Sequence, residues 1–239
     1  MKVRVKYAKT GPLKFISHLD VMRYFQKSIR RAGLDIAYST GLSPHQVISF
    51  AAPMPLMLTS EAEYFDAEFN SLPSHDEFVK RLNDVGNPFM AVRDAAILPE
   101  KSLNSMAAVT ASSYQITLTE KGKKEIGEVW EKHFPDKLME LSNDREIIVV
   151  KKTKTKEEPT DIRPMIHELE YRIDGSVYML LAAGSKVNLR PEQVLTEMCR
   201  RSDITYDRFH YDILRLETYM DTAGPERFAA LIEAGDRTF

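Results

Sequence analysis

Strict alternation of apolar and polar residues predicts strands in the first third of the chain. In residues 2–8, KVRVKYA, Val3, Val5 and Tyr7 share one side, and three basic residues share the other. Residues 63–69, EYFDAEF, alternate in the same way. Because side chains alternate across a strand with a period of two, both segments are predicted to be half-buried strands.

A different spacing predicts a helix over residues 18–32. Ser17 followed by Asp20 is a capping pattern, because the hydroxyl accepts an unpaired backbone N–H and the acid faces the positive helix end. Gly33 stands where a helix-ending glycine is expected. With a rotation of about 100° per residue, one face of this helix carries the apolar residues Met22, Phe25, Ile29 and Ala32.

The remaining patterns complete two similar halves. In the first half, extended segments are expected at 35–39, 46–51 and 89–97, with a second helix at 75–85. The resulting β-α-β-β-α-β order is the split unit of a ferredoxin-like fold. The second half repeats this order with one additional strand. Its predicted elements are strands at 113–119, 145–152, 165–173, 177–183 and 209–220, and helices at 123–134 and 191–201.

We therefore predict an α+β protein built from two tandem ferredoxin-like (βαββαβ-type) halves with antiparallel sheets. The predicted division is an N-terminal half at 1–99, a linker at 100–112, a C-terminal half at 113–220 and a tail at 221–239. Within the C-terminal half, the strand at 145–152 is apolar on both faces, so it is expected to be central, and 151–160 is expected to be a charged loop.

The predicted strand order explains the basic side of the first strand. The first strand of such a sheet neighbours the third, so Lys2, Arg4 and Lys6 are expected beside Asp66 and Glu68. Opposite charges that face each other across strands stabilise a sheet by about 0.2–1 kcal/mol per pair. We therefore expect this basic side to be a structural pairing and not an open nucleic-acid platform, which would need stacking aromatic residues.

Composition narrows the class of protein. The 239 residues are 43% hydrophobic and 28% charged, which is ordinary for a soluble globular protein. A net charge of −2 means that any nucleic-acid surface must be local. Cys199 is the single cysteine, which excludes an internal disulfide framework and a Cys-ligated iron–sulfur cluster within the chain. No signal-peptide region or run of transmembrane length is found, so we expect a cytoplasmic protein without a membrane partner.

The helix at 18–32 and the loop after it form the main candidate site. The face opposite the apolar residues carries four cations, offset nearby only by Asp20; they are Arg23, Lys27, Arg30 and Arg31. This face is either an ordinary solvated surface or a phosphate-facing stripe. The loop STGLSPH ends at His45 and contains small or hydroxylic residues, including Ser39, Gly41 and Ser43. Such residues let backbone N–H groups approach an anion. It lacks the ending of a nucleotide P-loop, so it is either a plain turn or one wall of a polar groove.

Two further sets of residues are weaker candidates for a functional site. His18 and His45, with Asp20 near the first, could form a metal site or a general acid–base pair, or His18 could simply be a packed residue. We expect no metal, because the spacing is not a zinc pattern and no cysteine joins it. Arg163 in DIRP and Arg190 in NLRP each precede a proline, which holds the arginine backbone extended. Arg190 beside the following helix N-terminus could bind an anion or form an interdomain salt bridge.

The segment FISHLDVMRYFQKSIRRAGLDIAYSTGLSPHQVISFAAPMPL resembles a family of radical-SAM-associated proteins, a domain of unknown function. The family's typical pattern is FxSHLDxxRxxxRAxRRAGLPxAYSxGFNPHPxxSFAxPLPxG. The resemblance continues through SEAEYFDAEF, DIRP and NLRPEQVL and covers roughly residues 2–220. Domains of this family occur alone or fused to B12-binding-type radical SAM proteins, which implies such an enzyme as a partner. No assigned roles come with the matching positions, which are His18, Asp20, Arg23, Arg30, Arg31, Ser39, Gly41, Pro44, His45, Ser49, Arg163 and Arg190.

The chain departs from the family pattern at three positions. Ser43 replaces the usual asparagine, Val47 stands where a lysine is common, and Met57 stands where a glycine usually ends the PLPxG motif. The missing lysine removes one cation from the expected groove, and the missing glycine is expected to change the loop after Pro55. The chain also lacks a CxxxCxxC motif, so any radical chemistry is expected on the partner.

These observations favour a non-enzymatic accessory or substrate-recognition module of a radical SAM system. It would bind RNA or another anionic macromolecule through the basic helix and the adjacent loop, with no cofactor of its own. One alternative is a metal-independent RNA endonuclease-like enzyme, similar to the CRISPR repeat-processing endonucleases, with His18 or His45 as general acid–base. Another is a protein-docking scaffold that binds an acidic partner through the basic stripe.

Overall fold

The computed structural model describes residues 1–152 and 157–239, and its contacts group the chain into two units. The first unit comprises residues 1–110 and 215–239, and the second comprises residues 111–214. The described residues form six α-helices and a set of mainly antiparallel strands, which confirms the predicted mixed α+β class. None of these helices has the length and apolar character that crossing a bilayer requires.

The first unit has the element order β-α-β-β-α-β between residues 2 and 97. Its elements are β1 (Lys2–Lys9), α1 (His18–Arg31), β2 (Ile48–Phe50), β3 (Thr59–Glu68), α2 (His75–Asp84) and β4 (Val92–Ile97). β1 lies between β4 and β3 and pairs antiparallel with both. Because β1 occupies one edge of β3, the other edge is left for β2 and for residues 215–221 of β10 (Tyr211–Asp221).

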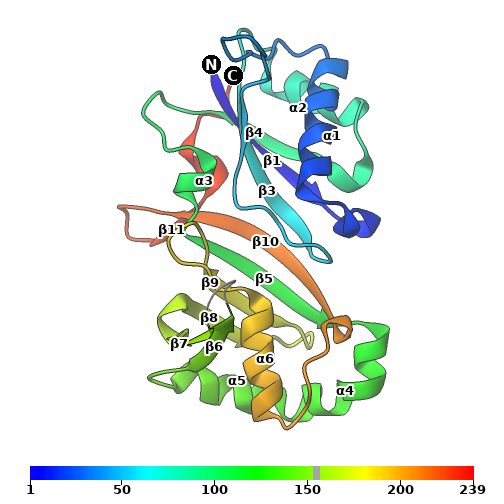
Figure 1. Ribbon diagram of the computed structural model, residues 1–239, viewed down its shortest axis with the longest axis vertical. Helices are drawn as coiled ribbons and strands as arrows, with labels where there is room; N and C mark the ends of the chain where they lie inside the picture. The colour runs from blue at the N-terminus through cyan, green and yellow to red at the C-terminus, as the bar shows by residue number, and fades with distance from the viewer. Residues whose placement is uncertain (153–156) are drawn as a thin grey trace. The chain divides into compact units, whose positions relative to one another are not determined.

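The helices α1 and α2 cover one face of this sheet (Figure 1). The capping pattern predicted for α1 is present, because the backbone N–H of Asp20 donates to the Ser17 hydroxyl at 3.3 Å. Gly33 ends the helix with a φ of +63°, a conformation that favours glycine. The buried face of α1 packs on the apolar side of β1, where the rings of Tyr7 and Phe25 lie 4.5 Å apart.

The opposite face of the sheet holds the predicted charge pairing. Arg4 lies opposite Asp66 in the β1–β3 register, and the arginine Nε donates to the Asp66 carboxylate at 2.8 Å. Lys2 also reaches Asp66, at 3.7 Å, while Lys6 pairs with Glu217. Arg4 and Asp66 are both almost fully buried, so this face is a covered structural layer and not an open platform.

Two segments predicted as a linker and a tail cover that face. Residues 100–112 include the short helix α3 (Ser105–Ala108), and the tail includes β11 (Phe228–Ala230) and a 3-10 turn at Leu231–Ala234. The carbonyls of Leu103 and Leu231 accept hydrogen bonds from the Arg4 guanidinium, at 3.0 and 3.1 Å. Residues 100–110 and the tail are therefore integral parts of the first unit, and Ala111 and Ser112 begin β5 (Ala111–Leu118) of the second.

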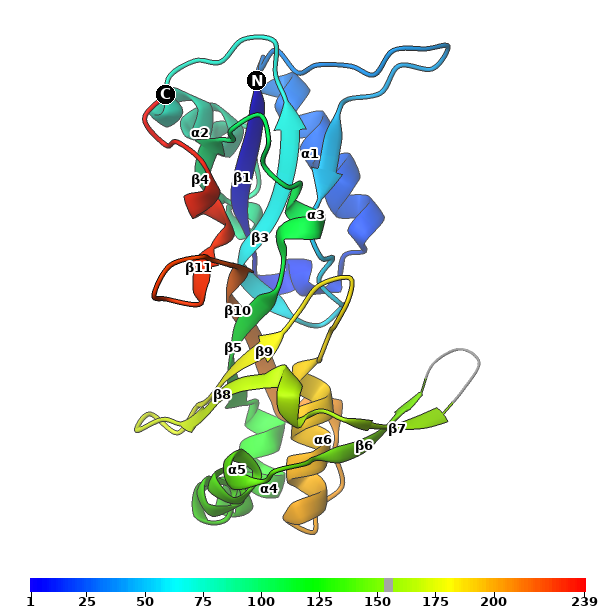
Figure 2. The same cartoon turned by 90° about the vertical axis from the view of Figure 1, so that its left-hand side faces the viewer.

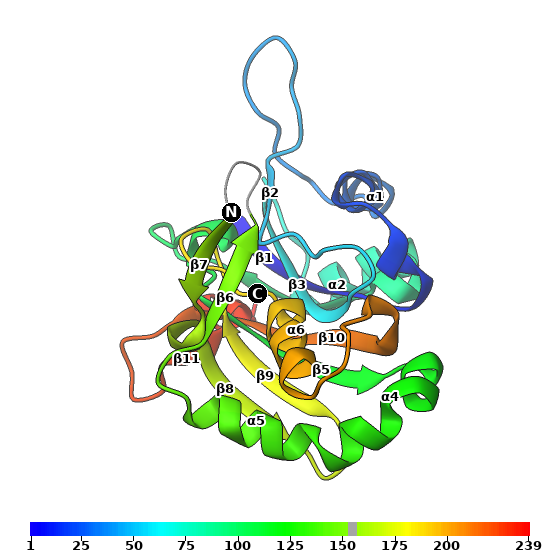
Figure 3. The same cartoon turned by 60° about the horizontal axis from the view of Figure 1, so that its bottom comes forward.

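The second unit follows the predicted order with two differences. Its elements are β5 (Ala111–Leu118), α4 (Glu120–Lys132), α5 (Phe134–Asn143), β6 (Ile148–Lys152), β7 (Glu157–Asp161), β8 (Ile166–Tyr171), β9 (Val177–Ala182), α6 (Pro191–Arg201) and the first residues of β10. β9 lies between β5 and β8. The helix α5 was not predicted, and it packs against α4, α6 and β8 (Figure 3).

The prediction that residues 145–152 form a central strand is wrong. Among the described residues, β6 pairs only with β7, in a separate two-stranded sheet that is drawn as a projecting ribbon in Figure 2. Ile148 and Val150 are 49% and 62% exposed, so the apolar character of this strand does not come from burial in a sheet. Residues 151, 152 and 157–160 of the predicted charged loop belong to these two strands, and residues 153–156 lie outside the described ranges.

The buried ion pair of the first unit makes a stability prediction. Asp66→Ala leaves the Arg4 guanidinium buried without its carboxylate, so the free energy of unfolding is expected to fall by about 3–5 kcal/mol in urea denaturation. Glu68→Ala, at an exposed position of the same strand, is the matched control and is expected to change it by less than about 0.5 kcal/mol. The apolar double variant Arg4→Met/Asp66→Leu should recover most of the loss, and equal losses for Asp66→Ala and Glu68→Ala would contradict the assignment.

Candidate functional site

Three of the four predicted cations of α1 line one hollow, which we call the basic groove. Its cations are Arg23, Lys27 and Arg30, and its far wall is formed by Tyr38 and His45. The hollow has a volume of about 240 Å³ and also contacts Gln26 and Gln46. The structure therefore brings the predicted helix face and the predicted loop together.

The loop wall is the base of an arm formed by residues 37–47. The arm begins as a narrow ladder, in which Val47 donates to the Ala37 carbonyl and Ser39 donates to the His45 carbonyl, at 3.0 and 2.8 Å. The Ser39 hydroxyl lies 2.9 Å from Nδ1 of His45 and accepts the His45 backbone N–H at 3.1 Å. Figures 2 and 3 show the arm standing away from α1 and β2.

The tip of the arm is exposed, while its base is tied to α1. Gly41 at the tip has a φ of +129°, and Ser43 is exposed beside it. Gln46 at the base is buried, and its side-chain amide donates to the Gln26 carbonyl of α1 at 3.2 Å. This contact holds His45 against the helix face that carries the cations.

The charges of the stripe are only partly balanced. Asp20 accepts a hydrogen bond from the Ser17 hydroxyl at 2.7 Å and lies 3.7 Å from Arg23. Arg31 is exposed but lies outside the groove, with its guanidinium 3.5 Å from the Ser28 hydroxyl. Within the described ranges, Lys27, Arg30 and Arg31 form no ion pair with a carboxylate. The groove therefore presents uncompensated positive charge to solvent.

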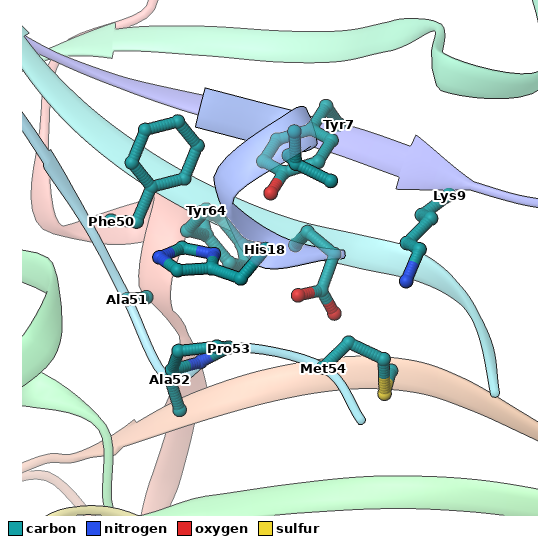
Figure 4. Close-up of a pocket in the computed structure, with 11 residues that line it drawn as sticks. Tyr7, Lys9, His18, Phe50, Ala51, Ala52, Pro53, Met54 and Tyr64 are labelled. Atoms are coloured by element: carbon teal, nitrogen blue, oxygen red, sulfur yellow. The ribbon is translucent and has the colours of Figure 1, made fainter. Parts of the chain in front are cut away.

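His18 lies away from the groove, at the N-terminal end of α1. It lines a separate small pocket with Lys9, Glu63 and the loop at 51–54, and Figure 4 shows Lys9 and His18 on different sides of that pocket. The His18 ring packs edge-on against Phe50, with centroids 5.4 Å apart. His18 and His45 therefore do not form the acid–base pair considered from the sequence.

The pocket around His18 is strongly charged for a buried site. Lys9, Glu63 and Arg215 are each no more than 5% exposed, and Arg215 pairs with Glu63 at 2.8 Å. Burial lowers the pKa of His18 and also that of Lys9; for both groups the Glu63 carboxylate acts in the opposite direction. Burial and the Glu63 carboxylate together hold the pKa of Tyr7 well above its usual range.

The two arginines predicted from DIRP and NLRP lie in the second unit. The Arg163 guanidinium donates to three backbone carbonyls, those of Asp144, Ile166 and Ser142, at 3.0–3.1 Å, so it has a structural function. Arg190 is exposed at the N-terminus of α6, where its backbone N–H donates to the Gln193 side chain at 3.2 Å. Neither arginine lines the basic groove.

One cluster in the second unit has the composition of a metal site, but its geometry favours an ion-pair network. Glu125, Asp207 and His210 bring one possible ligand atom each within 4.8 Å of one another. The Lys121 ammonium already lies 2.5 Å from Asp207, and His210 Nε2 lies 2.8 Å from Glu125. The buried Nδ1 of His210 has no hydrogen-bond partner in the part of the chain that the structure describes, whereas a metal-bound histidine normally donates its second N–H.

The buried charges were missed from the sequence, although a signal was present. Lys9 continues the apolar side of β1 two residues after Tyr7, and Glu63 continues the apolar side of β3 two residues before Phe65. A charged residue in the apolar phase of a strand must either be solvated at the strand end or be paired inside. Arg215 gave no such signal, because its contact with Glu63 depends on the tertiary fold.

Together these features define a mixed α+β protein with a basic surface groove and a separate charged pocket. The sequence matches, over residues 2–191, the family described as "Uncharacterized protein conserved in bacteria (DUF2344)". The chain belongs to this family. No curated protein matches it.

Two histidines of the first unit have pKa values shifted in opposite directions from the usual histidine pKa. The pKa of His18 is lowered by burial, whereas that of His75, despite burial, is raised by hydrogen bonds to Asp76 and Asp94. In a pH titration followed by imidazole NMR signals, His18 should protonate below about 6.5 and His75 above it. The reverse order would contradict the described pocket.

The same shift fixes the sign of a stability change. Below the ordinary histidine pKa of about 6.5, the unfolded chain binds a proton at His18 more readily than the folded chain, so stability falls as pH falls. The free energy of unfolding of His18→Gln, relative to wild type, should therefore rise between about pH 7.5 and pH 5.5. His75→Gln should show the opposite trend, because its folded pKa is raised.

The position at which the family glycine is replaced makes a separate prediction. Met57 has a φ of +71°, and its backbone N–H donates to the Lys14 carbonyl at 2.7 Å, so the left-handed turn persists without glycine. Because this region disfavours L residues with a side chain, Met57→Gly should raise the free energy of unfolding by about 1 kcal/mol. Asp203, with a φ of +54°, is the control, and Asp203→Gly should gain less because aspartate tolerates this region better.

Proposed function

We propose that this protein is a non-catalytic RNA-binding module that binds the phosphate backbone through the basic groove. The observation that carries the proposal is the convergence of Arg23, Lys27 and Arg30 on one hollow with the arm base. The net charge of the chain is −2, so such a surface has to be local, and these cations are concentrated on one helix face.

The far wall of the groove supports an RNA ligand in particular. Tyr38 is 50% exposed, and its ring offers a surface on which an unpaired base could stack. His45 adds a hydrogen-bonding group beside the cations. At the arm tip, outside the groove, backbone N–H groups near Gly41 can approach a phosphate closely. None of the described residues that line the groove is a carboxylate, so an anion would meet no direct repulsion from them.

The wider setting of this function rests on the sequence resemblance. We propose that the module acts in the cytoplasm with a radical SAM protein as its partner and presents an RNA or ribosome-linked substrate to it. The chain has one cysteine, and that residue is buried, so the radical chemistry would take place on the partner. The antiparallel order β4-β1-β3-β2 in the first unit supports the ferredoxin-like assignment, which we extend by proposal to the second.

The test compares two variants that each remove four positive charges. The groove variant is Arg23/Lys27/Arg30/Arg31→Ala, and the control variant is Lys123/Lys124/Lys132/Lys137→Ala on α4 and α5. Binding of total cellular RNA is measured across a salt titration. For single strands, log K falls with log salt by about 0.7 per neutralised phosphate, so the groove variant should bind more weakly with a slope flatter by up to about 3.

The outcomes separate the proposal from its alternatives. The control variant is expected to keep the affinity and slope of the intact protein, and equal losses in both variants would mean that only overall charge matters. If the intact protein binds no RNA, the proposal is wrong and a protein-docking function takes its place. Cleavage of the RNA in EDTA, lost on His18→Ala or His45→Ala, would establish the endonuclease alternative.

A further inference from the structure

The pocket at the N-terminal end of α1 contains a buried lysine that forms no direct ion pair among the described residues. Lys9 is 3% exposed, and among the described residues its ammonium hydrogen-bonds only to the Ile16 carbonyl, at a long 3.3 Å. Lysine is almost never fully buried unless it is paired. Its two remaining N–H donors therefore need an acceptor that the described chain does not supply.

The nearest carboxylate is already engaged. Glu63 pairs with Arg215 at 2.8 Å, and Lys9 forms no ion pair with any described carboxylate. With Lys9 and Arg215 positive and Glu63 negative, the cluster carries one net positive charge when His18 is neutral. Tyr7 and Tyr64 complete the titratable groups that line the pocket, and neither supplies a negative charge, because burial holds the pKa of each phenol high.

The space beside these groups has the size of a single small ligand. The pocket holds about 10 Å³ of solvent-accessible space, close to the requirement of one water-sized body. Its wall includes Lys9, His18 and the loop residues Ala52, Pro53 and Met54 (Figure 4). Glu63 also lines it, with its carboxylate paired to Arg215 at 2.8 Å. Neither ring nitrogen of His18 forms a hydrogen bond within the described ranges, so the imidazole is also available to a ligand.

A buried amine without a counterion has two solutions: it loses its proton, or it binds an anion. We infer that this pocket binds one small monoanion, either a halide or one oxygen of a carboxylate, through Lys9 and the imidazole of His18. The electrostatics agree with this assignment. Burial lowers the pKa of Lys9, the Glu63 carboxylate opposes this shift, and Arg215 adds to it. A bound anion would act in the same direction as Glu63 and favour the charged form of Lys9.

This inference is independent of the proposed RNA-binding function. None of the residues that line the pocket lines the basic groove, although α1 contributes to both. Loss of RNA binding would therefore leave anion binding unaffected, and the converse also holds.

The experiment uses the purified protein, residues 1–239, with bromide and formate as separate probes. Anomalous diffraction from crystals grown in bromide should give a peak within hydrogen-bonding distance of Lys9 Nζ, and formate at excess should remove it if a carboxylate occupies the same place. In solution, each probe should shift the His18 imidazole signals and raise their apparent pKa. Methanesulfonate, a bulkier monoanion, provides the control at equal ionic strength.

Variants assign the effect to the pocket. Lys9→Met should weaken the response of His18 by about tenfold or more, because a charge-assisted hydrogen bond is lost. Lys80→Met, at an exposed lysine of α2, should leave it unchanged. If Lys9→Met does not fold, His18→Gln serves instead, with bromide still expected at Lys9 Nζ. No bromide peak at Lys9, together with equal effects of bromide, formate and methanesulfonate on His18, would overturn the inference.

Discussion

Burial of Arg4 and Asp66 is the constraint on which the first unit depends. An arginine that is almost inaccessible to water needs acceptors for its donors in fixed positions, because an unsatisfied buried charge strongly destabilises a fold. β3 supplies the carboxylate, the segment after β4 supplies the carbonyl of Leu103, and the C-terminal segment supplies the carbonyl of Leu231. The Ser105 backbone N–H donates to the same carboxylate at 2.7 Å, so the pair also fixes the start of α3.

This layer determines which surface remains for binding. Because one face of the sheet is covered by α1 and α2 and the other by the segments around Leu103 and Leu231, neither offers an open platform. Ligand contacts in the first unit remain available at the outer face of α1, at the arm at 37–47 and in the small pocket at the helix N-terminus. A further hollow of about 270 Å³ lies beside β2 and β3. A helix with a buried apolar side and an exposed cationic side thus supports both the core and the groove.

Local rules predicted much of the first unit. The cap at Ser17, the glycine after α1 and the period-two strands are encoded by neighbours in sequence, and the charge pairing of Arg4 with Asp66 followed from strand order. Helical phase also placed Arg23, Lys27 and Arg30 together on one side. These features need no knowledge of distant contacts, which explains why they were accessible from the sequence.

Other features depended on contacts that the sequence does not encode locally. The exposed strand β6 was predicted to be an interior strand because it is rich in apolar residues. Residue types do not reveal which strand is its partner, and among the described residues that partner is β7. The burial of Lys9 with Glu63 and Arg215 depends on a residue 152 positions after Glu63, and only the fold brings it there. The sequence left open whether His18 acts with His45 or is a packed residue, and the structure places it in that pocket, against Phe50.

The discontinuity of the first unit has a consequence for its biosynthesis. Residues 1–110 emerge from the ribosome well before residues 215–239, and the whole second unit is translated between them. Since Arg4 takes one of its acceptors from Leu231, the first unit cannot complete the hydrogen bonds of its buried arginine until that segment has been translated. The second unit, a continuous stretch, can fold first, so the order of folding is expected to run opposite to the order of numbering.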